Sequence, residues 1–115
     1  MTIEQCYQAM GADYGDVSRR IPGEAMIKKF ATKFPEDESF TQLTAALKSG
    51  NAETAFRAVH TLKGLCLTLG FSHLTAPASD LTELLRAGEL EGGEALYRLL
   101  AQEYEKTVKL LKAVD

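Results

Sequence analysis

The chain has 115 residues, of which 45% are hydrophobic and 25% are charged, and its formal net charge is −3 at pH 7. This composition excludes wholesale disorder, and the length suits a single domain over residues 1–115 with its own hydrophobic core. Because the charge is negative and the Lys/Arg clusters are small, nucleic acid is not expected as a partner.

The first residues predict two short helices. Thr2 is a typical N-cap for a helix that runs through about Met10 and ends at Gly11. Asp13 can begin a second short helical piece. We expect these small elements to form a lid over one end of a bundle of longer helices.

Residues 22–35 and 36–48 predict the next two helices. Pro22 and Gly23 open the first and Pro35 closes it, and its expected apolar face consists of Ala25, Met26, Phe30 and Phe34. The second has an apolar stripe at helical spacing, formed by Phe40, Leu43, Ala46 and Leu47. The short link of residues 49–51 then makes the following helix an antiparallel neighbour.

Residues 53–71, which read ETAFRAVHTLKGLCLTLGF, predict the central helix, and Gly70 ends it. At about 100° per residue, one side of this helix carries the apolar residues Ala55, Ala58, Leu62, Leu65, Cys66 and Leu69. The other side carries Glu53, Arg57, His60, Lys63 and Gly64. His60 is therefore predicted to face outward.

Two further helices complete the chain. Ser72 can cap a helix that runs to about Ala87, although Pro77 would remove a backbone hydrogen bond in its second turn, so this helix either bends or begins near Thr75. Residues 94–113 hold the apolar stripe of a long last helix. Since no segment alternates as a strand would, we predict an all-α fold: an antiparallel up-down four-helix bundle with the short N-terminal helices capping one end.

The residues beside His60 favour a special role for this histidine. Lys63 lies one turn beyond it, and Gly64 lies directly above it at i+4. Glycine in a helix interior costs about 1 kcal/mol relative to alanine, so its presence calls for a reason. A missing side chain beside the imidazole lets another macromolecule come close, and the ammonium of Lys63 supplies positive charge to a group that the ring acquires.

The run His60-Thr61-Leu62-Lys63-Gly64, followed by Leu69-Gly70-Phe71 and then by Leu74 and Leu81, resembles the histidine-containing phosphotransfer (HPt) domain family. The signature of that family is an H-x-x-K-G helix followed by a Leu-Gly turn. The resemblance implies that His60 accepts a phosphoryl group and that Lys63 stabilises its charge. The implied partner is a response-regulator receiver domain of a two-component phosphorelay, with a sensor histidine kinase as a further candidate partner.

The phosphoryl transfer that the resemblance implies requires few catalytic groups from the protein itself. A neutral imidazole attacks phosphorus in line, and because the transition state is loose, the protein contributes mainly position and charge. The chain has neither a G-x-x-x-x-G-K-[ST] loop nor a Gly-rich kinase loop, so we expect a phosphocarrier without ATP-binding kinase activity. We expect no cofactor in this chain, since the family implies that the receiver brings Mg²⁺.

Three apolar residues, Phe56, Leu67 and Phe71, fall within about 40° of His60 on the helical wheel. Either neighbouring helices cover them or they form an exposed patch that meets the receiver, and we expect partial exposure. At the position where the family often has a Glu or Gln that holds the imidazole, this chain has Thr82. Its hydroxyl can still accept a hydrogen bond from the ring, but without charge.

The sequence gives weaker support to other functions. Di-iron bundles need Glu-x-x-His pairs, which the chain lacks, and two histidines and two cysteines form no usual tetrahedral metal set. No Ser-His-Asp or Cys-His arrangement suggests a hydrolase. The main alternative is a non-catalytic module that docks a receiver without carrying phosphate; the uncharged Thr82 favours it, whereas the intact His60 and Lys63 argue against it.

The sequence also predicts a cytoplasmic protein without membrane contact. No apolar run approaches the roughly twenty residues of a membrane span, and residues 1–10 lack the features of a signal peptide. Cys6 and Cys66 are far apart and are expected to be reduced, buried thiols. The start at Met1 and a last helix that ends close to Asp115 favour a free-standing monomer.

Overall fold

The computed structural model describes residues 1–115 and contains helices but no strand, which confirms the all-α prediction. The body measures 40 × 24 × 19 Å. None of its helices combines the length and the apolar character that crossing a membrane requires. In chain order the elements are α1 (Ile3–Met10), α2 (Tyr14–Arg20), α3 (Glu24–Ala31), the 3-10 helix η1 (Phe34–Glu36), α4 (Ser39–Lys48), α5 (Ala52–Leu69), α6 (Ser72–Arg86) and α7 (Gly93–Leu111).

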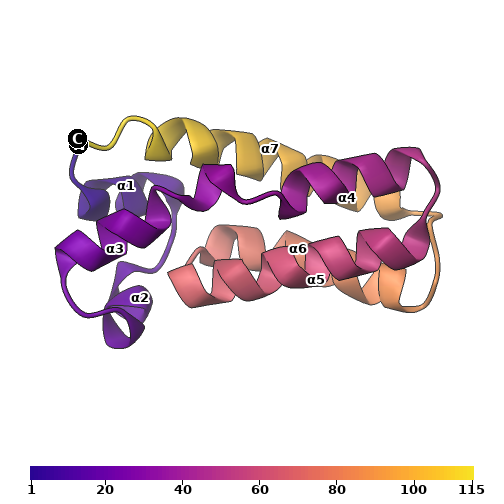
Figure 1. Ribbon diagram of the computed structural model, residues 1–115, viewed down its shortest axis with the longest axis horizontal. Coiled ribbons are helices and arrows are strands. Elements are labelled where there is room, and N and C mark those ends of the chain that lie inside the picture. The colour runs from indigo at the N-terminus through magenta and orange to yellow at the C-terminus, as the bar shows by residue number, and fades with distance from the viewer.

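The four helices from α4 to α7 lie along the long axis, and the chain reverses direction at each link between them (Figure 1). Within this group α5 packs against both α4 and α6, and α6 packs against α7. The reversals around α5 are tight because Gly50 and Gly70 both adopt the left-handed conformation, each with φ of 72°. Asn51 caps the start of α5, since its Oδ1 accepts a hydrogen bond of 3.1 Å from the Thr54 N–H.

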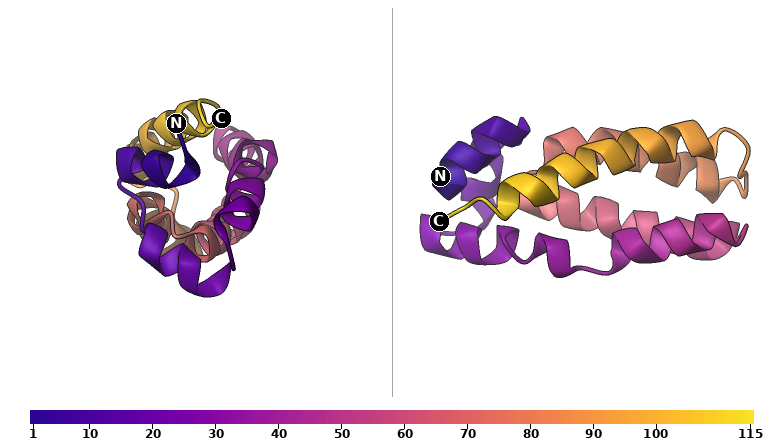
Figure 2. Two further views of the ribbon diagram at one scale, coloured as in Figure 1. Left: turned by 90° about the vertical axis from the view of Figure 1, so that its left-hand side faces the viewer. Right: turned by 90° about the horizontal axis from the view of Figure 1, so that it is seen from above.

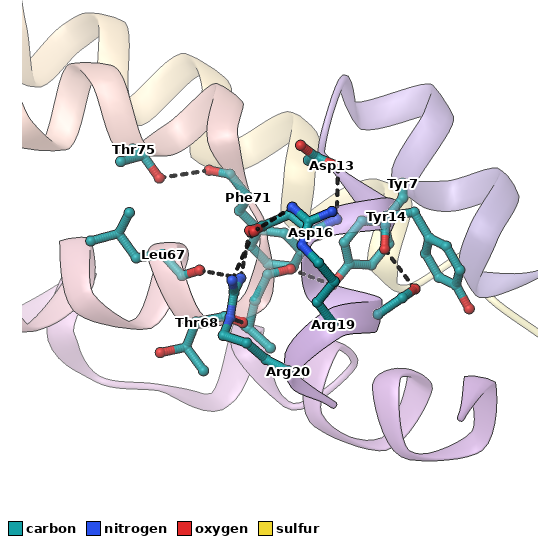
Figure 3. Close-up of polar contacts among 12 residues, drawn as sticks. Tyr7, Asp13, Tyr14, Asp16, Arg19, Arg20, Leu67, Thr68, Phe71 and Thr75 are labelled. Carbon is teal, nitrogen blue, oxygen red and sulfur yellow. Dashed lines mark hydrogen bonds and ion pairs between the residues drawn. The ribbon is translucent and has the colours of Figure 1, made fainter. Parts of the chain in front are cut away.

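Helices α1, α2 and α3 gather at one end of the four long helices (Figures 1 and 2). Their inner side meets the carboxyl end of α5, where four backbone carbonyls lack partners within the helix. The Arg20 guanidinium donates hydrogen bonds to the carbonyls of Leu67, at 2.6 Å, and Thr68, at 3.1 Å (Figure 3). The Asp13 N–H donates to the Gly70 carbonyl at 2.8 Å. The lid thus supplies donors that the end of α5 needs.

A chain of aromatic rings joins the lid to the four long helices. Phe71, which follows the Gly70 turn at the end of α5, packs edge-on against Phe34 with ring centroids 5.0 Å apart. Tyr7 of α1 packs against the same Phe71 ring at 5.4 Å. All three side chains are buried, so the lid and the long helices share one hydrophobic core.

Two details of the predicted helices are wrong. In α3 the buried residues are Ile27 and Ala31, while Met26 and Phe30 are exposed, so the core-facing stripe lies one residue further along the chain than predicted. The reason is that Phe34 lies in η1, beyond the end of α3, and points into the core. Ile27 and Ala31 lie on the same side of the chain as Phe34 and are buried with it. In α6, Ser72 is the first helical residue and caps nothing; the helix runs from there through Pro77.

Candidate functional site

Helix α5 holds the predicted site on a well-anchored rod of 18 residues. Its buried face consists of Ala55, Ala58, Val59, Leu62, Cys66 and Leu69. This stripe packs α5 between its neighbours and fixes which side of the helix meets solvent. The residues that the sequence placed on the opposite side therefore project from a rigid element.

His60 is exposed on this outer side, as predicted. Lys63 is half-buried one turn further on, and Gly64 is exposed. A Cβ atom added at Gly64 would have no neighbour within 4 Å, so the surface beside the imidazole is open. The arrangement gives an accessible nucleophile, a nearby ammonium group and a clear approach, which suits attack on a group carried by another macromolecule.

Phe56 lies one turn before His60, and their ring centroids are 5.6 Å apart. Arg86 of α6 places its guanidinium carbon 5.1 Å from the centroid of the Phe56 ring. Arg86 could not be predicted from the spacing of residues along α5, because it lies on α6. Only the packing of α6 beside α5 brings this cation to the site.

Leu67 is 51% exposed and lies two turns beyond His60, whereas Phe56 is half-buried. Both residues are therefore available to a partner that covers the outer side of α5. Together with His60 and Gly64 they form what we call the α5 face.

Phe71 does not belong to this face, and the expectation of its partial exposure is wrong. Its exposed fraction is 0%. The helical wheel that placed it near His60 assumes that the helix continues through residue 71, but α5 ends at Leu69 and the left-handed turn at Gly70 redirects the chain. Phe71 consequently points into the core between Phe34 and Tyr7.

Thr82 is likewise 0% exposed. Its hydroxyl donates a hydrogen bond of 2.6 Å to the Ala78 carbonyl of its own helix. The predicted contact with the His60 ring is absent, because a short threonine side chain on the core side of α6 bonds within its own helix instead of reaching across to α5. Thr82 is therefore a core residue and offers nothing to a docked partner.

His73, the second histidine, is half-buried and hydrogen-bonded to Thr107, which makes it a poor nucleophile. The Thr107 hydroxyl donates to the Glu103 carbonyl at 2.7 Å, so its hydrogen is already used. It must therefore accept from His73 Nε2, which lies 2.7 Å away, and this leaves Nδ1 buried without a hydrogen-bond partner. Burial lowers the pKa of His73, although the carboxylate of Glu103 acts in the opposite direction.

The cysteines offer no alternative chemistry. Cys6 and Cys66 are both buried and unpaired. Burial raises the pKa of Cys66 to about 12, so its thiol stays protonated and unreactive. No group of three or more His, Cys, Asp or Glu side chains is placed to hold a metal ion. The largest cavity, of about 680 Å³, lies between η1 and the end of α5 and is not lined by His60.

The chain matches the model of a known protein family. The model of the Hpt domain matches residues 25–109, a stretch that contains the whole of α5 and α6. Helices α1 and α2 precede the matched stretch. Neither the search of curated proteins nor that of solved structures gives a match.

Proposed function

Because the chain belongs to the Hpt domain family, we propose that it is a histidine phosphotransfer protein that carries a phosphoryl group on His60 within a two-component phosphorelay. The observation that carries this proposal is the exposure of His60 beside an unobstructed Gly64 on the rigid helix α5. In this proposal α4 to α7 act as an antiparallel up-down four-helix bundle, and the chain is a single domain that works as a cytoplasmic monomer.

The transfer step needs one nucleophile and one source of positive charge. A ring nitrogen of neutral His60 attacks the phosphorus of an aspartyl phosphate, and a P–N bond forms as the P–O bond breaks. The electron pair of the broken bond stays on the aspartate, which leaves as a carboxylate. The other ring nitrogen carries the proton and can release it to water. Lys63 stabilises the phosphoryl oxygens electrostatically.

The partner that fits this chemistry is a receiver domain, which supplies the aspartate and Mg²⁺. The α5 face is the proposed docking surface, because Phe56 and Leu67 flank His60 with apolar area and Gly64 leaves room for the partner's backbone. Arg57 and Arg86, each paired with a glutamate of its own helix, lie near its edges. A sensor histidine kinase is the second proposed partner, as the original source of the phosphoryl group.

A docking module that carries no phosphate is the second candidate. The observation that favours it is that the Thr82 hydroxyl bonds to Ala78, so the His60 ring gains no hydrogen bond from that position. Such a module would bind a receiver through the same α5 face and regulate it by covering its aspartate.

The two candidates are separated by labelling. Receiver domains charged with acetyl phosphate are mixed with the protein, and phosphotransfer predicts an acid-labile, base-stable label that His60→Gln abolishes. His73→Gln is the matched control, since it replaces the half-buried second histidine, and this variant should keep the label. Label retained in His60→Gln would overturn the proposal. Binding of the receivers without any label would favour the docking module.

A further inference from the structure

The orientation of the His60 ring is set by very few contacts. Of the two histidine rings, only that of His73 is hydrogen-bonded to another protein group. Thr82 is turned toward Ala78, and Gly64 has no side chain to offer. An exposed imidazole on a helix would therefore be free to change rotamer unless another group restrains it.

Phe56 is the group in position to do so. It lies on the same stripe of α5 at i−4, and its ring meets the imidazole at a centroid distance of 5.6 Å with an interplanar angle of 45°. This distance falls within the range of about 4.5–7 Å in which aromatic pairs attract. The contact restricts the ring of His60 while leaving the side toward Gly64 open to a partner.

Phe56 is itself held from a second helix. The Arg86 guanidinium lies 5.1 Å from the Phe56 ring centroid, within the range of a cation–π contact. Arg86 in turn pairs with Glu83, one turn earlier on α6, at 3.3 Å on the exposed surface. A relay of contacts thus runs from Glu83 and Arg86 on α6 to Phe56 and His60 on α5.

We propose that Phe56 is the positioning residue of His60 and that Arg86 acts through Phe56 by holding its ring in place. The inference rests on the proposed function, because it concerns the alignment of the nucleophile in phosphotransfer. In-line attack requires a ring nitrogen to point at the phosphorus, and a ring with one preferred orientation reaches that geometry more often than a freely rotating one. The contact between the tilted rings of Phe56 and His60 performs the task that a hydrogen-bonding side chain from α6 would otherwise perform.

The test compares ring order and transfer rate in the same set of variants. Phe56→Leu removes the aromatic contact while keeping apolar volume, and Phe56→Tyr restores a ring. Arg86→Gln removes the cation, and Arg98→Gln is its matched control, since it removes an arginine from a comparable ion pair, with Glu94, on α7. Nuclear Overhauser contacts between residues 56 and 60 and the ¹³C relaxation of the His60 ring report order. Single-turnover transfer from a phosphorylated receiver, over a range of receiver concentrations, reports the rate.

We expect Phe56→Leu to lower the transfer rate at saturating receiver by roughly fivefold and to increase ring mobility, with Phe56→Tyr restoring both. Arg86→Gln should weaken the Phe56–His60 Overhauser contacts and lower the same rate by about twofold, relative to Arg98→Gln. A Phe56→Leu rate equal to the parent's would overturn the inference. If that variant does not fold, unchanged ring order and rate in Arg86→Gln would overturn it equally. A parent protein that takes no label refutes phosphotransfer itself, which is a separate result.

Discussion

The hydroxyl of Tyr7 in α1 donates a hydrogen bond of 2.6 Å to the carbonyl of Leu69, the last residue of α5. The bond is buried and joins residues that are 62 positions apart in the chain. Burial also raises the pKa of Tyr7, so the phenol remains a donor over the whole physiological range. The lid is therefore tied to the helix that carries His60.

Tyr7→Phe should lower the free energy of unfolding by about 1–3 kcal/mol, because it leaves the buried Leu69 carbonyl without this donor. Tyr14→Phe is the control, since the Tyr14 ring packs on Tyr7 at 5.3 Å while its hydroxyl makes no hydrogen bond within the protein. Urea denaturation followed by circular dichroism measures both. Equal losses in the two variants would show that the Tyr7 hydroxyl contributes nothing specific.

Gly70→Ala should destabilise the protein more than Gly50→Ala, although both glycines have φ of 72°. A Cβ atom at Gly70 would lie 2.7 Å from the backbone oxygen of Asp13, whereas one at Gly50 would have no neighbour within 4 Å. Both variants carry the strain of a left-handed alanine, about 1 kcal/mol, and we expect Gly70→Ala to lose roughly 1–3 kcal/mol more. Matching urea midpoints would contradict the close approach of the lid.

Gly64→Ala should make the protein more stable and less active. In an exposed helix interior, alanine is more stabilising than glycine by roughly 0.5–1 kcal/mol. The added methyl group at position 64 would meet open space. The same methyl group would stand between the α5 face and a docked receiver, so we expect transfer to slow by roughly tenfold. Gly15→Ala in α2 is the control and should leave the rate unchanged. Transfer as fast as the parent's in Gly64→Ala would argue against close docking at this position.

Stability should decrease in mild acid because of His73. Its pKa is lowered in the folded protein, chiefly by burial, so the unfolded chain binds the proton more readily. The free energy of unfolding is therefore insensitive to this group above the ordinary histidine pKa of about 6.5 and falls as the pH drops below it. His73→Gln should remove this part of the pH dependence. Urea curves at about pH 7.5 and about pH 5.5 measure it, and identical pH dependence in parent and variant would exclude His73 as the source.

Much of the fold could be predicted because local signals agree with the packing. The caps at Thr2 and Asp13 are present: Thr2 Oγ1 accepts a bond of 3.1 Å from Gln5 N–H, and Asp13 Oδ1 accepts one of 2.9 Å from Asp16 N–H. The end of the central helix at Gly70 is confirmed. Glycine and cap residues determine helix ends through contacts within one turn, so these ends can be predicted from the local sequence alone.

The parts that could not be predicted depend on contacts between helices. A helical wheel drawn through Gly70 placed Phe71 on the surface, whereas the turn buries it. Family spacing suggested Thr82 as a partner of His60, but its side chain is too short to leave the core. Arg86 reaches the Phe56 ring only through the packing of α6 beside α5. Each case needs the position of a second element, which periodicity along one helix cannot supply.

The bonds from Arg20 and Asp13 to the end of α5 have a consequence for how this protein should be divided. Both donors come from residues that precede 25–109, the stretch that the Hpt domain model matches. A fragment trimmed to that stretch would expose the final turn of α5 without its donors, and fraying from there would advance toward the histidine. In this chain the segment that the family model matches is shorter than the segment that keeps the helix of His60 intact.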